Sequence, residues 1–151
     1  MKLIGDYEFK AARQVVWDTL LTPEALKAAI PGCKKLTLVG EDEYKADLSI
    51  GFAAIRGEYS GDVKLEDKEP YHYKMLIEGS GGPAGYIKSV GYIELVEAGE
   101  KTILKYDLDA EIGGKMAAVG QRVLGGVAKV LMGQFWKAMG KEVAKNISKE
   151  S

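Results

Sequence analysis

Apolar and polar residues alternate along much of the chain, as expected of β-strands with one covered face. The alternating segments are residues 3–10, 44–52, 55–65, 71–77 and 104–112. A further strand is expected near 86–96, where the pattern leaves open which face is covered. Turn-forming residues separate these segments at 39–42, 67–70, 79–85 and 98–100. The pattern therefore predicts an antiparallel sheet built from consecutive strands.

Three other stretches follow a helical pattern. The first spans Arg13 to Leu20, and the second begins at Thr22-Pro23 and ends at Pro31. The third follows the pair Gly113-Gly114 and runs from Met116 to about Ile147. Only this last helix is long enough to cover the sheet. We predict an α+β fold in a single domain, residues 1–151, with a curved antiparallel sheet of six to seven strands around a long C-terminal helix and two short helices after the first strand.

The predicted long helix contains Gly125, Gly126, Gly133 and Gly140, and each costs roughly 1 kcal/mol against Ala in a helix interior. At 100° per residue its apolar residues cover an arc of about 200°, and Gly126, Gly133 and Gly140 lie beside a basic row. These glycines allow close packing of the short helices or a partner subunit, or they leave a groove or hinge. A membrane-spanning glycine dimer motif does not fit, because the spacing is seven and charged residues interrupt the run.

Charge is distributed unevenly along the chain. The net charge is −1, which argues against a general nucleic-acid-binding protein. From Gly113 onward, however, seven basic residues stand against Glu142 and Glu150, a net of +5, so the preceding residues carry −6. A basic C-terminal segment either forms a solvated helix face or favours an anionic membrane surface or an acidic partner.

The sequence indicates a cytoplasmic protein. Cys33 is the single cysteine, which rules out an intrachain disulfide. Asp6 and Glu8 interrupt the region where a signal peptide needs an apolar run, and the longest uncharged stretch, 79–87, is too short to span a membrane.

Residues for catalysis or metal binding are scarce. His72 is the single histidine, and the strand period turns it outward, so nucleophilic catalysis that depends on a histidine is disfavoured. One histidine and one cysteine do not make a usual zinc site, and no acidic cluster has calcium-loop spacing. The segment 79–85 lacks the Lys-Ser/Thr end of a phosphate-binding loop. We therefore predict no catalytic residues, no metal site and no cofactor.

Aromatic residues and glycines share the predicted inner face of the sheet. Phe52, Tyr59, Tyr73 and Tyr106 fall on inward positions, interleaved with Gly57 and Gly61. They face a helix rich in Met and Val. Large aromatics beside glycines outline a ligand pocket, or they fill a core with tyrosine hydroxyls at its rim, and the pattern does not separate these readings.

Three motifs resemble those of a known family. They are IPGC at 30–33, GSGGPAG at 79–85 and, above all, GGKMAAVGQRVLGGVAKVLMGQFW at 113–136. They resemble the CoxG family, which is named after a subunit of carbon monoxide dehydrogenase, and the similarity spans nearly the whole chain. Family members more often have Ala-Gln-Leu-Gly-Ser-Arg near 118–122 and Phe-Phe at 135–136. The family has the helix-grip fold shared with START and Bet v 1 proteins.

The resemblance implies a non-catalytic accessory protein of a molybdenum hydroxylase or CO dehydrogenase system. Such a protein binds a hydrophobic, lipid-like or quinone-like molecule between sheet and long helix and helps link the enzyme to the inner face of the membrane. The residues expected to line the site are Phe52, Tyr59, Tyr73, Tyr106, Met116, Val123, Val127 and Phe135. The segment 79–85 is expected to gate the site, the basic row to face anionic lipid or a partner, and Arg122 to form a structural ion pair.

Two alternatives stay open. An enzyme of the same superfamily, of polyketide cyclase or aromatase type, needs acid/base groups inside the pocket, whereas the assigned inward positions are apolar or tyrosine. An interaction subunit, which includes an oligomer of this chain, needs only a filled core. A buried carboxylate with a shifted pKa favours the enzyme, and an inner space too small for a ligand favours the interaction subunit.

Overall fold

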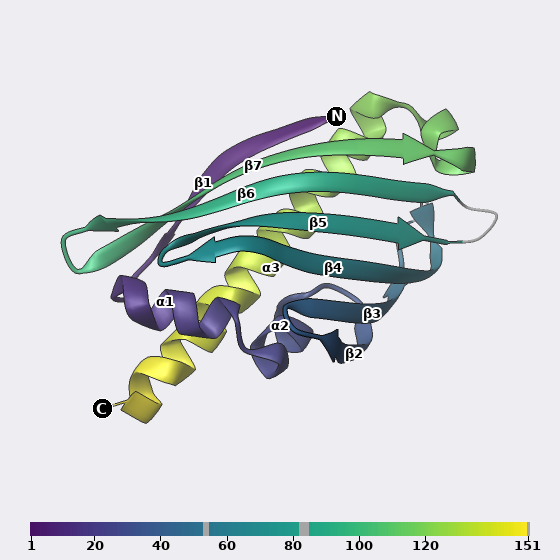
Figure 1. Cartoon of the computed structure of the whole chain (residues 1–151). Helices are drawn as coiled ribbons and strands as arrows, with labels where there is room; N and C mark the ends of the chain where they lie inside the picture. Colours follow the sequence, from purple (N-terminus) through teal and green to yellow (C-terminus); the bar gives the residue numbers. More distant parts are fainter. Residues whose placement is uncertain (53–54, 82–84, 151) are drawn as a thin grey trace.

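Seven strands form one antiparallel sheet in the order β1-β7-β6-β5-β4-β3-β2 (Figure 1). The computed structural model describes residues 1–52, 55–81 and 85–150, without the side chains of 148–150. The strands are β1 Lys2–Phe9, β2 Cys33–Gly40, β3 Glu43–Ile50, β4 Gly57–Glu69, β5 His72–Ser80, β6 Tyr86–Ala98 and β7 Lys101–Gly113. The helices are α1 Arg13–Leu20, α2 Pro23–Ala29, the 3-10 helix η3 Gly114–Val119 and α3 Gln121–Glu150. The predicted architecture is confirmed.

Two elements differ from the sequence-based expectation. The strand β2 was not predicted, because Leu38 and Val39 are both 56% exposed at the sheet edge, so no alternation marks it. The long helix begins at Gln121 rather than at Met116. Gly120 has a φ of 98°, which interrupts the helix and leaves Met116 in η3.

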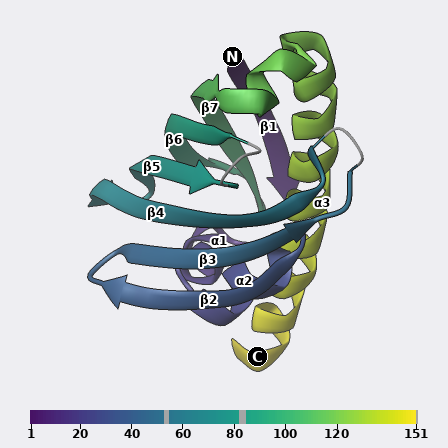
Figure 2. The ribbon, with the colours of Figure 1, turned by 90° about the vertical axis from the view of Figure 1, so that its right-hand side faces the viewer.

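The sheet curves around α3, and α1 and α2 lie beside the C-terminal half of that helix (Figure 2). The well-buried core gathers there. Phe9 from β1, Leu104 from β7, Val16 from α1 and Met139 from α3 are all at most 2% exposed. Trp17 packs beside them, with its ring 5.7 Å from that of Tyr73. Apolar burial at this end fixes α1, α2 and the C-terminal half of α3 against the sheet.

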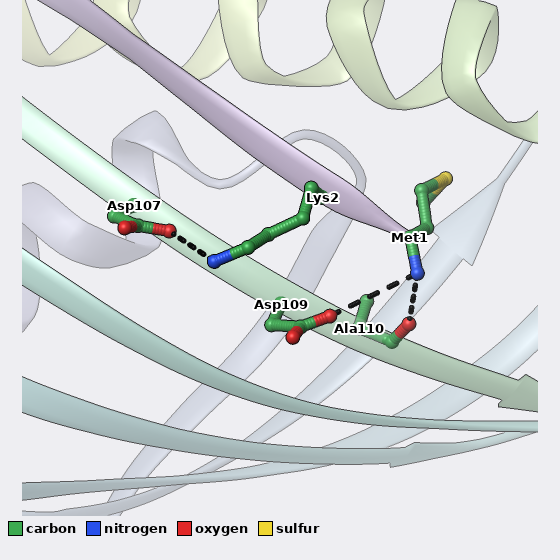
Figure 3. Close-up of polar contacts among 5 residues, drawn as sticks. All are labelled: Met1, Lys2, Asp107, Asp109 and Ala110. Atoms are coloured by element: carbon green, nitrogen blue, oxygen red, sulfur yellow. Dashed lines mark hydrogen bonds and ion pairs between the residues drawn. The ribbon is translucent and has the colours of Figure 1, made fainter.

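Strand β1 is held at the other sheet edge by backbone pairing with β7. Figure 3 shows that the amino group of Met1 donates a hydrogen bond to the Ala110 carbonyl at 2.7 Å, with Asp109 3.9 Å away. Lys2 Nζ lies 3.0 Å from Asp107 Oδ1, and this hydrogen bond and charge raise the pKa of Lys2. These contacts set the position of the inward residues of β1 relative to α3.

Candidate functional site

The inner face of the sheet is packed at one end and open at the other. Away from α1 and α2, the inward residues are half-buried rather than buried, although they are apolar. This group comprises Leu48, Tyr59, Ile77, Ile87, Leu108 and Ile112. Backbone pairing places Gly61 beside Gly79, and Gly79 beside Ile87, in one row across the sheet. A Cβ built on Gly61 would have only the Glu78 carbonyl oxygen, at 3.7 Å, within 4 Å.

Helix α3 also leaves space on its inner side. At 100° per residue, Gly125 lies within about 40° of the direction of the fully buried Met139. Gly125 is half-buried, yet a Cβ built on it would meet nothing within 4 Å. The structure therefore leaves room for additional atoms on the sheet-facing side of the N-terminal half of α3.

The heptad glycines of α3 do not pack against another described segment. A Cβ on Gly126 or Gly133 would also meet nothing within 4 Å, and both residues are exposed. A Cβ on Gly140 would only reach the Tyr7 hydroxyl, at 3.5 Å. Close packing of the short helices on this strip is therefore not found, and Gly126 and Gly133 border solvent. Among the described helices, α3 included, none is both long and apolar enough to cross a membrane.

Three predicted site residues gather around aromatic neighbours. Tyr73 is only 7% exposed, lies in the packed core, and has its pKa raised by burial. The ring of Tyr106 stacks on Trp136 at 5.6 Å between centroids, and that of Phe135 meets Trp136 edge-on at 4.8 Å. Tyr106 and Phe135 thus mark the boundary between the packed core and the open end.

The other predicted site residues are spread over three elements. Phe52 is half-buried after β3, and the Tyr59 hydroxyl donates a hydrogen bond to the Ile55 carbonyl. Partial burial raises the pKa of Tyr59. Val127 is half-buried on α3, and Met116 is half-buried on η3.

Val123 and Arg122 are corrections to the predicted site. Val123 is 49% exposed on the outer side of α3, so it faces away from the sheet. Arg122 is exposed and has no ion-pair partner among the described residues, so the expected structural ion pair is not formed.

The expected gate at 79–85 includes residues 82–84, which lie outside the described residues. At its end, a Cβ on Gly85 would overlap the Gly113 carbonyl oxygen and lie 3.2 Å from Met116 Cβ. Gly85 also has a φ of +124°, which L side chains rarely adopt. Glycine is therefore required where this segment meets the start of η3.

Trp136 was missing from the predicted site. It is 8% exposed and lies between Tyr7 and Tyr106. Its indole Nε1 is buried, and no described residue supplies an acceptor. A buried donor without a partner normally costs about 1–3 kcal/mol. The helical position of Trp136, within about 60° of Met139, could have placed it on the inner side.

Groups for acid/base or metal chemistry are lacking in the described part of the chain. No acidic side chain there is buried, and Thr19, Ser89 and Thr102 are the buried polar residues. His72 faces outward, as predicted, with Nε2 3.7 Å from Glu69. Nowhere in residues 1–52, 55–81 and 85–150 do three metal-ligating side chains gather.

Two surface hollows lie outside the candidate site. One, of about 350 Å³, lies between β1 and the C-terminal half of α3. The other, of about 370 Å³, is lined by β1, β6 and β7 and includes Tyr106. The candidate site itself is best described as an apolar face between sheet and helix with unfilled positions at Gly61 and Gly125.

A curved antiparallel sheet around a long C-terminal helix defines the START-like class of proteins. A START superfamily protein from Mycobacterium smegmatis has a TM-score of 0.77 at 15% identity, covering 95% of this chain and 97% of that one. The Zhui aromatase/cyclase from Streptomyces sp. R1128 has a TM-score of 0.67 at 12% identity, covering 97% and 95%. At these identities the likeness establishes the fold alone.

Sequence comparison identifies the family within this class. The family model for the carbon monoxide dehydrogenase protein CoxG matches residues 5–144, and the chain therefore belongs to the CoxG family. A conserved protein from Geobacillus kaustophilus is 48% identical, with a TM-score of 0.92 and coverage of 96% of both chains. No curated protein matches the sequence. Family and fold support an accessory or ligand-binding protein associated with CO dehydrogenase.

Proposed function

We propose that this protein is a non-catalytic carrier that binds a hydrophobic molecule, lipid-like or quinone-like, between the sheet and α3. It serves a molybdenum hydroxylase such as CO dehydrogenase in the cytoplasm and helps link that enzyme to the membrane. The observation that carries this proposal is the unfilled space beside Gly125, on the inner side of a helix that faces half-buried apolar residues.

Ligand contacts would come from both layers. From the sheet side, the proposed lining residues are Phe52, Tyr59 and Tyr106, together with the unfilled position at Gly61. From the helix side they are Met116, Val127 and Phe135, with Tyr73 behind them as packed support. Apolar contacts supply most of the binding free energy in such sites, and a few polar groups orient the ligand.

Trp136 offers the polar contact that the proposal needs. A quinone has carbonyl oxygens, which accept hydrogen bonds. The Nε1 donor of Trp136 has no acceptor among the described residues, and its ring stacks on Tyr106, which is itself a proposed lining residue. A ligand carbonyl that reached this donor would satisfy it, which favours a quinone-like molecule over a plain hydrocarbon.

An aromatase or cyclase role is less well supported. Acid/base catalysis requires a titratable group placed against the substrate. On the described inner face, the half-buried and buried side chains are apolar, tyrosine or Ser89. The fold likeness to the Streptomyces aromatase/cyclase therefore does not extend to a set of acid/base residues.

The test compares two leucine substitutions on α3. Native mass spectrometry would be run on the wild type, Gly125→Leu and Gly133→Leu after incubation with a quinone-containing lipid extract. Leucine at 125 would occupy the inner space, whereas leucine at 133 points to solvent. Both substitutions favour the helix, so both variants are expected to fold.

The proposal predicts a discrete bound mass on the wild type and on Gly133→Leu, and loss of that mass on Gly125→Leu. Retention by Gly125→Leu would place the ligand elsewhere. If no form retained an apolar molecule under any loading, the protein would instead be an interaction subunit without a carrier function.

A further inference from the structure

The outer side of α3 carries positive charges without matching negative ones. Arg122, Lys129, Lys137 and Lys141 are exposed, and none has an ion-pair partner within the described part of the chain. At 1.5 Å per residue, these four cations span roughly 30 Å of helix. The sheet surface is different, because lysines there pair with carboxylates, as in Lys68–Asp42 at 2.8 Å and Lys34–Glu58 at 3.0 Å.

Acidic residues near this row are already paired. Glu142 lies 2.8 Å from Lys145, one turn beyond Lys141. Glu8 on β1 lies 3.6 Å from Lys101. The row of four cations therefore keeps its positive charge, and we name it the basic face of α3.

Exposed apolar residues lie within the basic face. Val123 is 49% exposed and Val130 is 47% exposed. Together with Lys137 and Lys141, they lie within about 20° of the direction opposite Met139. In Figure 2 the sheet, α1 and α2 all lie to one side of α3, which forms an edge of the molecule. Gly126 and Gly133 keep the surface between the two valines low.

The hollow between β1 and α3 continues the basic face at its C-terminal half. Its volume is about 350 Å³, and Lys10, Lys137 and Lys141 contribute to its lining. Tyr7 and Gly140 lie between these lysines, and the absence of a side chain at Gly140 leaves the Tyr7 hydroxyl uncovered on that side, since a Cβ there would lie 3.5 Å away. Three ammonium groups around a small hollow suit an anionic head group.

We propose that the basic face docks on an anionic lipid bilayer, with a lipid phosphate in the hollow formed by Lys10, Lys137 and Lys141. This inference rests on the proposed function, because a carrier of a membrane-soluble molecule must meet the bilayer that holds it. Cations at such a surface attract anionic lipid at about 1 kcal/mol each, which corresponds to roughly fivefold in partition per residue.

Other occupants fit the basic face less well. A symmetric contact between two copies would set four cations against four, which is repulsive. A protein partner would be expected to meet large anchoring side chains, and the basic face has valines and glycines but no tryptophan, tyrosine or phenylalanine. The modest apolar content also means that bilayer binding depends mainly on charge and weakens with salt.

The test measures cosedimentation of ligand-free protein with vesicles. The vesicles contain either phosphatidylcholine alone or a mixture with phosphatidylglycerol. The test variant is Lys129→Gln/Lys137→Gln/Lys141→Gln. The control variant, Lys45→Gln/Lys88→Gln/Lys105→Gln, removes the same number of exposed lysines from β3, β6 and β7.

Wild type and control are expected to bind the phosphatidylglycerol vesicles and to be released by salt. The test variant should partition about a hundredfold more weakly. Equal binding of test and control variants, equal binding to neutral vesicles, or no vesicle binding by the wild type would each overturn the proposal. The last result, together with a dimer or with a complex with an acidic protein, would identify a different occupant.

A second measurement locates the contact. A polarity-sensitive fluorophore would be attached to Val130→Cys in a Cys33→Ser background, with Leu38→Cys as the control at the far sheet edge. Emission should shift to the blue on anionic vesicles for position 130 only. A shift at position 38 instead would overturn the proposed orientation. Because no carried ligand is present, vesicle docking can fail while ligand retention persists, and the reverse also holds.

Discussion

Two glycines of α3 occupy positions where alanine fits. A Cβ on Gly126 or Gly133 meets nothing within 4 Å, and both lie in a regular helix. We expect Gly126→Ala and Gly133→Ala each to raise the free energy of unfolding by about 1 kcal/mol, measured by urea denaturation. Gly120→Ala is the contrasting variant and should destabilise the protein, because Gly120 has a φ of +98°. Loss of stability at position 133 would show that this glycine packs against a partner.

The buried phenol of Tyr73 should limit stability in alkali. Burial raises the pKa of Tyr73 and also that of Tyr44, while an unfolded tyrosine has a pKa near 10. The folded state therefore holds its protons more tightly, and its stability is intact below about pH 10 and falls as the pH rises further. Urea denaturation across this range should show a smaller decline for Tyr73→Phe than for wild type. The exposed Tyr92→Phe is the control, and an equal decline in both variants would contradict the prediction.

At the level of elements, alternation was sufficient for the strands that have one covered face. It failed for β2, where Leu38 and Val39 are both exposed at the sheet edge. Periodicity also could not locate the start of α3, because residues 114–119 have helical composition but form a 3-10 turn before Gly120. The arc of apolar residues on α3 was wider than the buried face, so Val123 was assigned inward although it is exposed.

The two halves of α3 should differ in stability against local opening. Between residues 121 and 134, Leu124 is the buried residue, whereas Trp136, Met139 and Val143 are buried in the following ten positions. Fewer packed side chains mean a lower free energy of local opening. Amide hydrogen exchange should therefore be faster at 125–134 than at 136–146, and a bound apolar ligand should slow the first segment. Equal protection of both segments without ligand would indicate that the inner space is filled.

At the level of the whole molecule, the sequence predicted which layers face each other but not where space remains between them. The inward positions of Tyr59 and Tyr106 followed from the strand period. The unfilled volume at Gly125 did not, because an open position depends on how far the opposite layer lies from the helix. The choice of aromatics also passed over Ile77 and Ile87, which are half-buried at the open end.

Ligand site and basic face together make a prediction about transfer. Both belong to α3, so a bilayer against the outer side of the helix would lie close to the ligand between the helix and the sheet. Protein loaded with a quinone should release it faster to phosphatidylglycerol vesicles than to phosphatidylcholine vesicles, and salt should remove the difference. The variant Lys129→Gln/Lys137→Gln/Lys141→Gln should release it slowly to both, while retaining the same load when vesicles are absent. Separation of vesicles and protein by flotation, followed by quantification of the quinone in each fraction, measures this transfer. If the variant released its ligand as fast as wild type, transfer would proceed through free diffusion in water, and the basic face would have no part in delivery.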